Sequence, residues 1–330
     1  MSNTRFVLVD YLKGYSILTI ILYHLLSSYP FPSILQKIFM FGGAGVHVFI
    51  LCSGFGLYFS YLRKQLTYPQ FLKKRFSKIY WPYVLVILLT AIWESIQTNG
   101  LDYLAIASHV FLFKMFFEEY ENSYGEQMWF ISTIIQFYLF WPLIVKLFSK
   151  KMVYAFAISF VWAFFVVAVH LEEYRVFNSF FLQYLWEFVV GMYLAQLYYR
   201  CSVVHLPETK KLVVWGIVGL SLVSISGITG GIWKSFNDLP SLLGYLCIVI
   251  LCFKCSSRFL IKAFTAIGGF SYELYLVHVL VYSVCKTWLD SRVGVCTEIL
   301  ICFVAALCVA YGYHKLIYKS KNKFIEGSRI

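Results

Sequence analysis

Residues 11–25 read Tyr-Leu-Lys-Gly-Tyr-Ser-Ile-Leu-Thr-Ile-Ile-Leu-Tyr-His-Leu, an apolar stretch that carries one lysine and one histidine. Lys13 and His24 are eleven residues apart, and at about 100° per residue this separation makes roughly three turns of an α-helix. Both side chains therefore share one face of the predicted helix, about 16 Å apart along its axis. Ionisable groups inside a membrane are costly and usually mark a functional site, so we expect this pair to take part in the protein's chemistry.

Apolar stretches of about 17 to 25 residues, long enough to cross a bilayer as helices, recur along the whole chain. Of its 330 residues, 60% are hydrophobic and 13% are charged, whereas soluble domains are close to half apolar and a quarter charged. The sequence therefore predicts an all-α polytopic membrane protein that forms a single domain over residues 1–330. No small-residue cleavage site follows the first apolar stretch, so we expect that stretch to be retained. The ten predicted spans lie near residues 12–28, 42–62, 79–97, 128–148, 152–170, 179–199, 212–229, 240–256, 266–287 and 295–317.

The basic residues predict how these spans are oriented, because cytoplasmic loops of membrane proteins are enriched in Lys and Arg. With the N-terminus placed inside, most of the 28 basic residues fall in cytoplasmic segments, and the C-terminus is also inside. The basic cytoplasmic loops explain the net charge of +12, so this charge does not require binding to nucleic acid. If the apolar residues 103–117 also crossed the membrane, every later span would be inverted and more basic residues would lie outside than inside, against the positive-inside rule. We therefore expect a re-entrant or interfacial helix on the external side at these residues. The basic residues outside the cytoplasmic segments are Lys37, Lys114, Arg175, Lys234, Lys286 and Arg292.

Several predicted spans carry polar side chains that a purely hydrophobic role does not explain. The second contains His47 and the sixth contains Glu187. In the ninth, Ser271, Tyr275 and His278 lie at positions i, i+4 and i+7, which places them on one helix face. Each residue alone fits a structural hydrogen bond between helices. Together they predict a polar cavity inside the bundle.

A compact basic cluster precedes the third span. It contains Lys73, Lys74, Arg75 and Lys78, and residues 80–83 (Tyr-Trp-Pro-Tyr) follow it. Such a cluster fits a positive-inside anchor beside an aromatic belt. It equally fits a site for a phosphorylated cytosolic ligand, because Lys and Arg donate charge-assisted hydrogen bonds to phosphate.

Six blocks of sequence occur in a characteristic order. They are Asp10-Tyr11-Leu12-Lys13-Gly14 with Tyr23-His24; Gly45-Val46-His47-Val48-Phe49 with Ser53-Gly54-Phe55; Phe71 with Lys74-Arg75-Phe76-Ser77-Lys78-Ile79-Tyr80-Trp81-Pro82-Tyr83; Met128-Trp129-Phe130-Ile131-Ser132; Phe188-Val189-Val190-Gly191-Met192; and Phe270-Ser271-Tyr272 with Tyr275-Leu276-Val277-His278. Each block alone is weak, but the ordered set is specific and covers nearly the whole chain. In this set the chain resembles the acyltransferase-3 family of membrane acyltransferases.

The resemblance implies transfer of an acyl group, usually acetyl from cytosolic acetyl-CoA, to a hydroxyl of a glycan or glycolipid. His24 would be the general base, because an imidazole titrates near neutral pH. The remaining site residues fall into two groups by implied role. Lys13, Lys74, Arg75 and Lys78 would bind acyl-CoA, and Ser53, Trp129, Tyr275 and His278 would line the acceptor cavity.

Two positions depart from the family pattern. Lys13 stands where the family's basic-x10-His motif usually has arginine, and lysine lacks the planar fork that makes bidentate contacts. His47 stands where relatives often have an acidic residue, and the sequence assigns it no role. Many relatives also carry an extracytoplasmic hydrolase-like domain. We expect this chain to be the stand-alone form, similar to bacterial polysaccharide O-acetyltransferases.

The resemblance further implies a multi-pass protein of the bacterial cytoplasmic (inner) membrane. Its partners would be acetyl-CoA, a glycan or lipid-linked oligosaccharide acceptor, and the bilayer, with no nucleic acid. O-antigen, capsule and exopolysaccharide all fit as acceptors, and both acetyl and succinyl fit as the acyl group. Both direct transfer and a covalent acyl-enzyme fit the sequence, which also leaves the oligomeric state open.

The residues leave two other interpretations, a metal site at the cysteines and an exporter. Nine cysteines lie mostly in apolar runs with only one Cys-x-x-Cys, at Cys252 and Cys255, so we expect small hydrophobic side chains and no metal. The alternative function is an exporter of polysaccharide or lipid, in which the same polar groups line a conduit. The sequence shows no inverted repeat or pair of broken helices of the transporter kind, which disfavours this alternative.

Overall fold

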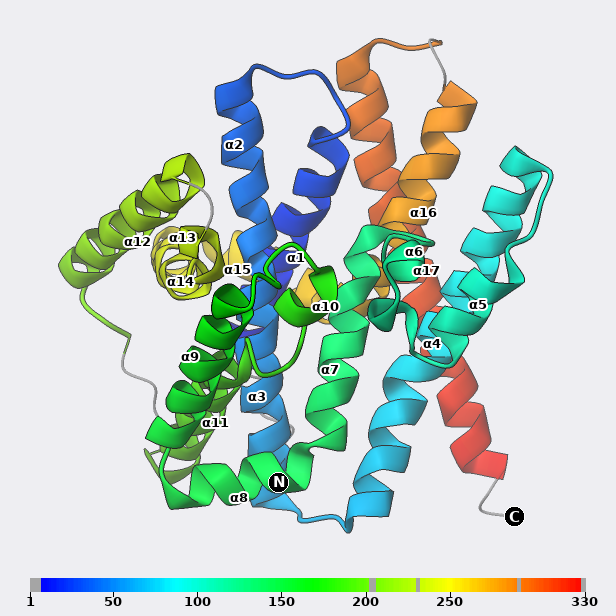
Figure 1. The fold of residues 1–330 in the computed structure, drawn as a ribbon. Helices are drawn as coiled ribbons and strands as arrows, with labels where there is room; N and C mark the ends of the chain where they lie inside the picture. Colours follow the sequence, from blue (N-terminus) through cyan, green and yellow to red (C-terminus); the bar gives the residue numbers. More distant parts are fainter. Residues whose placement is uncertain (1–6, 202–205, 230–231, 290–291, 328–330) are drawn as a thin grey trace. The chain divides into compact units, whose positions relative to one another are not determined.

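The computed structural model describes residues 7–201, 206–229, 232–289 and 292–327 (Figure 1). Every regular element within these ranges is a helix, which confirms the all-α fold class. Five helices of the described part are long and apolar enough to cross a bilayer, or up to seven when each of two bent helix pairs is counted as one span. This finding supports a multi-pass membrane protein, while the number of ten spans and the cytoplasmic position of both termini stay predictions.

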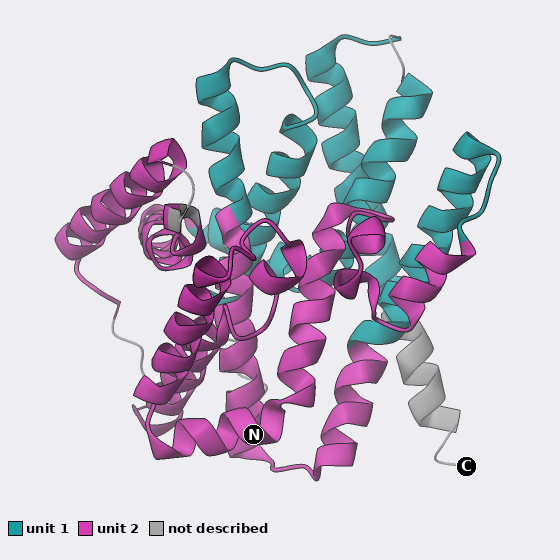
Figure 2. Ribbon diagram, viewed as in Figure 1, with its two compact units in different colours: residues 1–43, 79–102, 258–330 teal, residues 44–78, 103–257 magenta. Residues whose placement is uncertain are grey.

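The chain divides into two compact units, coloured separately in Figure 2. Unit 1 combines residues 1–43, 79–102 and 258–330, so its parts come from both ends of the chain and from one internal helix. Its helices are α1 (Val7–Leu26), α2 (Ser33–Phe41), the second part of α4 (Tyr68–Thr98), α15 (Arg258–Gly268), α16 (Ser271–Leu289) and α17 (Val295–Gly327).

Unit 2 combines residues 44–78 and 103–257. The short helix η1 (Gly42–Ala44) crosses the boundary between the units. The other helices of unit 2 are α3 (Gly45–Arg63), the first part of α4, α5 (Tyr103–Val110), η2 (Lys114–Phe116), α6 (Glu118–Glu121), η3 (Glu126–Met128), α7 (Trp129–Leu139), α8 (Trp141–Lys150), α9 (Val153–Ala168), α10 (Arg175–Asn178), α11 (Leu185–Cys201), α12 (Thr209–Thr229), α13 (Ile232–Ser235) and α14 (Asp238–Cys255).

Each of the ten apolar stretches overlaps a helix, but some of these helices are shorter or more polar than a simple membrane span. Helix α9 has 16 residues and α11 has 17, whereas about 20 apolar residues cross a typical bilayer. Helix α1 has 20 residues but includes Asp10, Lys13 and His24. Length and hydrophobicity therefore identify fewer spans than the sequence predicts.

Two of the predicted spans are broken into bent helix pairs, so the expectation that the chain contains no broken helices was wrong. The stretch 128–148 breaks at Phe140, where α7 and α8 are bent by 66°. Pro142 occupies the first turn of α8, a position where its missing N–H group costs no helical hydrogen bond. The stretch 266–287 begins in the last turn of α15, which is bent by 76° from α16.

In unit 1, two glycines set the contact between α1 and α15. A Cβ atom on Gly14 would overlap the backbone carbonyl of Phe264, and one on Gly268 would overlap the backbone carbonyl of Asp10. The two backbones are thus in direct contact, as in other membrane helix pairs that meet at small residues. This contact fixes the position of the helix that carries Lys13 and His24.

Unit 2 contains an equivalent contact between α3 and α11. A Cβ atom on Gly54 would overlap the carbonyl of Phe188, and one on Gly191 would overlap the carbonyl of Leu51. Helices α3 and α11 therefore pack backbone to backbone. This packing holds His47 of α3 beside Glu187 of α11.

The segment predicted to be a re-entrant or interfacial helix is broken into short pieces. Helix α5 has eight residues, which is too short to cross a bilayer. Lys114 follows it and is fully buried, and its Nζ donates hydrogen bonds to the carbonyl oxygens of Ser123 at 3.3 Å and Gly125 at 3.4 Å. Burial and the positive charge of Arg175 lower the pKa of Lys114 to about 7. The placement of this segment on the external side stays a prediction.

The buried Lys114 predicts a measurable pH dependence of stability. Above pH 7 the folded protein releases this proton, whereas the unfolded chain keeps it up to the ordinary lysine pKa of 10.5. The unfolded state then binds more protons, so the contribution of Lys114 to the free energy of unfolding rises with pH across this window. We expect Lys114→Met to unfold at a higher temperature than the wild type at about pH 7, and this difference to shrink at about pH 10. A difference that does not change with pH would contradict the assignment.

Candidate functional site

Helices α1 and α16 of unit 1 bring together three of the side chains that the sequence singles out. The rings of His24 and His278 have their centroids 5.3 Å apart, and the rings of Tyr275 and His278 are 6.1 Å apart. His278 and Tyr275 are buried, whereas His24 is partly exposed. Tyr282 also donates a hydrogen bond from its hydroxyl to the carbonyl of Ile21 at 3.2 Å, which ties α16 to α1.

The surroundings of His278 determine which of its ring nitrogens carries the proton. Nδ1 lies 2.8 Å from the carbonyl oxygen of Tyr275 and 3.1 Å from that of Leu274. A carbonyl oxygen can only accept, so Nδ1 must be the donor, and in the neutral imidazole Nε2 is then an acceptor. Nε2 is buried and has no hydrogen-bond partner among the described residues. His278 thus has an unused acceptor atom on the imidazole next to His24.

The polar stripe Ser271, Tyr275 and His278 lies on α16, and all three side chains are buried, as the spacing predicts. Ser271 donates from its hydroxyl to the carbonyl of Gly268 at 3.0 Å, so this member of the stripe caps the turn between α15 and α16. Lys13 lies partly buried on α1, which is one continuous helix through His24. Helical geometry therefore gives these two residues the common face predicted from their spacing.

Helix α4 carries Lys74, Arg75 and Lys78, here called the basic triplet. One of these side chains is enclosed and two are exposed. Lys74 and Lys78 are exposed, whereas Arg75 is partly buried. The Arg75 guanidinium lies 5.8 Å from the centre of the Phe71 ring and interacts with the buried Tyr138. Its Nε is buried and has no hydrogen-bond partner among the described residues. Arg75 is therefore the member of the triplet that unit 2 holds in a fixed position.

The predicted cavity residues Ser53 and Trp129 belong to different parts of unit 2. Ser53 is partly buried on α3, directly before the glycine that contacts α11. Trp129 opens α7 and stacks on Tyr184, with ring centroids 5.7 Å apart and an interplanar angle of 28°. The Arg175 guanidinium lies 5.3 Å from the centre of the Trp129 ring.

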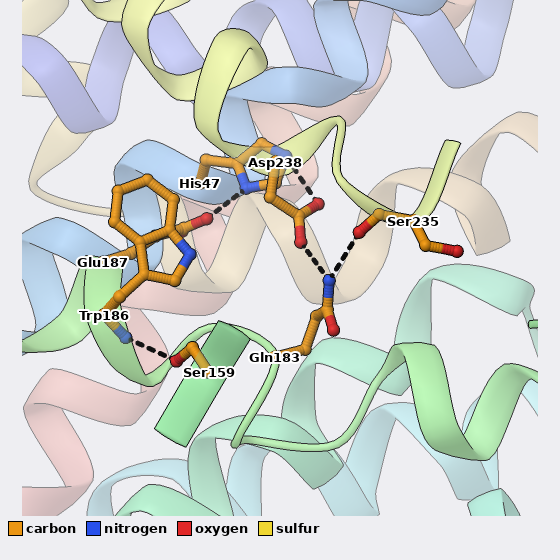
Figure 3. Close-up of polar contacts among 7 residues, drawn as sticks. All are labelled: His47, Ser159, Gln183, Trp186, Glu187, Ser235 and Asp238. Atoms are coloured by element: carbon orange, nitrogen blue, oxygen red, sulfur yellow. Dashed lines mark hydrogen bonds and ion pairs between the residues drawn. The ribbon is translucent and has the colours of Figure 1, made fainter. Parts of the chain in front are cut away.

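Unit 2 also contains a group of charged residues that the sequence did not assign, here called the charged cluster: His47, Glu187 and Asp238 (Figure 3). Nδ1 of His47 lies 2.8 Å from Oε1 of Glu187, and Nε2 lies 3.9 Å from Oδ1 of Asp238. Gln183 donates from Nε2 to Oδ2 of Asp238 at 2.6 Å. His47 and Glu187 were visible as polar residues within apolar stretches. Asp238 gave no such signal, because it precedes the predicted span 240–256.

A family model described as an acyltransferase domain matches residues 6–315, which is nearly the whole chain. The chain belongs to the acyltransferase-3 family. Membership confirms the resemblance and points to an acyltransferase, and together with the apolar helices it supports a membrane enzyme. Searches of curated proteins and of solved structures returned no match.

Within this acyltransferase-3 chain, the residues assigned by resemblance separate by unit. Lys13, His24, Tyr275 and His278 belong to unit 1, and the basic triplet, Ser53 and Trp129 belong to unit 2. In unit 1 the partly exposed imidazole of His24 lies beside the buried imidazole of His278. The enclosed guanidinium of unit 2 supplies donors suited to an anion. The roles of these residues in the reaction stay predictions.

Proposed function

We propose that this protein transfers an acetyl group from cytosolic acetyl-CoA to a hydroxyl of a cell-surface glycan or of its lipid-linked precursor. The observation that carries the proposal is the family match over residues 6–315. The partly exposed imidazole of His24 on α1 supports it, because acyl transfer to a hydroxyl needs a general base. The proposed location is the bacterial cytoplasmic membrane, with both termini inside and about ten spans.

In the proposed reaction, His24 is the general base. Its imidazole takes the proton of the acceptor hydroxyl while the hydroxyl oxygen attacks the thioester carbonyl carbon. The resulting tetrahedral intermediate expels the CoA thiolate as the C–S bond breaks, and the imidazolium returns the proton to this sulfur. The products are the O-acetyl ester and free CoA. A direct transfer of this kind needs no covalent acyl-enzyme.

The proposed donor site uses the basic residues on the predicted cytoplasmic side. The CoA phosphates would bind Lys74, Arg75 and Lys78, with Lys13 near the entrance of the pantetheine arm. Arg75 is partly exposed, which supports this role, since a guanidinium that solvent can reach can donate charge-assisted hydrogen bonds to a phosphate. Within unit 1, the face of α1 that Lys13 and His24 share is the proposed site of the pantetheine arm.

The function can be tested with the full-length protein reconstituted in lipid vesicles. Acetyl-CoA labelled in the acetyl group is supplied on one side, together with surface glycan that has been O-deacetylated by mild base. We expect the label to appear as a base-labile ester on the glycan and free CoA to be released in equal amount. Glycan movement across the vesicle without loss of the thioester would instead support an exporter.

Replacing Arg75 tests the proposed phosphate site. We expect Arg75→Ala to raise the KM for acetyl-CoA by about tenfold or more, because a charge-assisted hydrogen bond contributes roughly 1.5 to 3 kcal/mol. Lys74→Ala should have a smaller effect, since this side chain is exposed. Lys211→Ala, at an exposed lysine paired with Glu208, is the matched control. Unchanged acetyl-CoA affinity in the double variant Arg75→Ala/Lys78→Ala would rule out the assignment.

A further inference from the structure

The charged cluster of unit 2 has more hydrogen-bond acceptors than donors. Glu187 and Asp238 together present four carboxylate oxygens, whereas the donors beside them are the imidazole of His47 and the amide of Gln183. Oε2 of Glu187 is fully buried and has no hydrogen-bond partner among the described residues. An unpartnered buried carboxylate oxygen is costly. Asp238, whose side chain is 20% exposed, is the carboxylate of this cluster that a ligand with O–H or N–H donors can reach.

The side chains of His47 and Asp238 are both partly exposed, and one hydroxyl group can contact Nε2 and Oδ1 together. The 3.9 Å between Nε2 and Oδ1 is too long for a direct hydrogen bond, and a polar separation above about 3.5 Å suggests a bridging group. With the imidazole protonated, Nε2–H can donate to a hydroxyl oxygen whose own O–H donates to Asp238. The side chains of His47 and Asp238 are 13% and 20% exposed, so these two groups can be reached, unlike Glu187.

Neighbouring side chains extend the charged cluster into a mixed aromatic and polar group, in which Tyr184 and Gln183 are buried and Trp129 is partly exposed. The His47 ring is 6.0 Å from the Tyr184 ring, which stacks on Trp129 below the Arg175 guanidinium. Gln183 belongs to the same group and also donates to the carbonyl of Ser235 at 3.0 Å. Aromatic side chains with a few oriented polar groups are typical of small-molecule sites.

The predicted topology places the charged cluster on the external side. His47 lies near the outer end of the second predicted span, Glu187 near the outer end of the sixth, and Asp238 just before the eighth. The acceptor glycan in the proposed function would approach from that side. A sugar carries several O–H donors on neighbouring carbons and an apolar C–H face, which match the acceptor-rich cluster and its aromatic neighbours.

We propose that the charged cluster binds the carbohydrate acceptor, with one sugar hydroxyl held between Nε2 of His47 and Oδ1 of Asp238. Glu187 fixes the imidazole through its Oε1, and Gln183 fixes the Asp238 carboxylate (Figure 3). This inference rests on the proposed function and names the residues that recognise its acceptor. His47 and Asp238 bind and orient the sugar.

The test measures glycan binding and transfer separately with the full chain. The probe is an oligosaccharide released from the producing cells' surface glycan and O-deacetylated with mild base. His47→Asn keeps a donor at the position of Nδ1 for Glu187 but removes Nε2, and Asp238→Asn removes the negative charge. We expect each to weaken oligosaccharide binding by about tenfold or more and to raise the KM for the oligosaccharide, with acetyl-CoA affinity unchanged. Glu208→Gln, at an exposed carboxylate of the same unit, should bind the oligosaccharide like the wild type.

A second measurement needs no variant. Hydrogen exchange of the wild type should slow in peptides around residues 44–52, 182–190 and 236–244 when the oligosaccharide is added. Oligosaccharide affinity within twofold of the wild type in both variants, or slowed exchange only elsewhere in the chain, would overturn the proposal. If the wild type binds the oligosaccharide at the charged cluster but never acetylates it, the proposed function fails and the binding site stands. If it acetylates the oligosaccharide and both variants keep the wild-type KM, the binding site fails and the function stands.

Discussion

Replacing His24 with alanine is expected to lower the rate of acetyl transfer by about 10²- to 10⁴-fold, the usual contribution of a positioned general base. The loss should appear in kcat, because the side chain takes the hydroxyl proton as the reaction proceeds and does not hold the CoA phosphates. Acetyl-CoA binding, followed by the change in protein fluorescence, should stay within a few-fold of the wild type. The measurement is transfer of labelled acetyl to O-deacetylated glycan in reconstituted vesicles.

Other histidines provide the controls for this variant. His170→Ala is the matched control, since the His170 side chain is 90% exposed, and it should transfer acetyl at the wild-type rate. His278→Asn keeps a donor where Nδ1 meets the carbonyls of Leu274 and Tyr275 but removes Nε2. A fall in kcat with an unchanged unfolding temperature would show that Nε2 assists His24. Full acetyl transfer by His24→Ala would refute His24 as the base.

Replacing Gly54 with alanine is expected to lower the stability of the protein by about 1 to 3 kcal/mol or more, the cost of overpacking a tight contact. The added Cβ would overlap the carbonyl of Phe188, and backbone atoms cannot move aside as a flexible side chain can. Helices α3 and α11 would have to separate, and His47 and Glu187 would separate with them. Thermal unfolding in detergent should show the loss.

Gly56 provides a control on the same helix. A Cβ atom at Gly56 would meet nothing within 4 Å, so Gly56→Ala should leave the unfolding temperature unchanged or raise it. Alanine is favoured over glycine in a helix interior by roughly 1 kcal/mol. If Gly54→Ala and Gly56→Ala unfold at the same temperature, the close contact between α3 and α11 does not determine the stability of unit 2.

Much of this description could be predicted from the sequence because it depends on local patterns. The long apolar stretches predicted helices. The spacing of Lys13 and His24 predicted that both residues lie on one face of the first helix. The same argument correctly made Ser271, Tyr275 and His278 a buried stripe. The prediction of straight spans failed at Phe140, where the chain bends between α7 and α8 although the apolar character continues.

The sequence by itself therefore determined the helical fold class, the family and the residues that share a face within one helix. Only the tertiary structure decided which helices meet and how each is rotated. It brought His24 to His278, turned Arg75 inward while Lys74 stayed exposed, and assembled the charged cluster from α3, α11 and α14. Helical periodicity fixes relations within a few turns. Contacts between distant segments depend on which backbones can approach, as they do at Gly54 and Gly14, and a single sequence does not reveal those pairings.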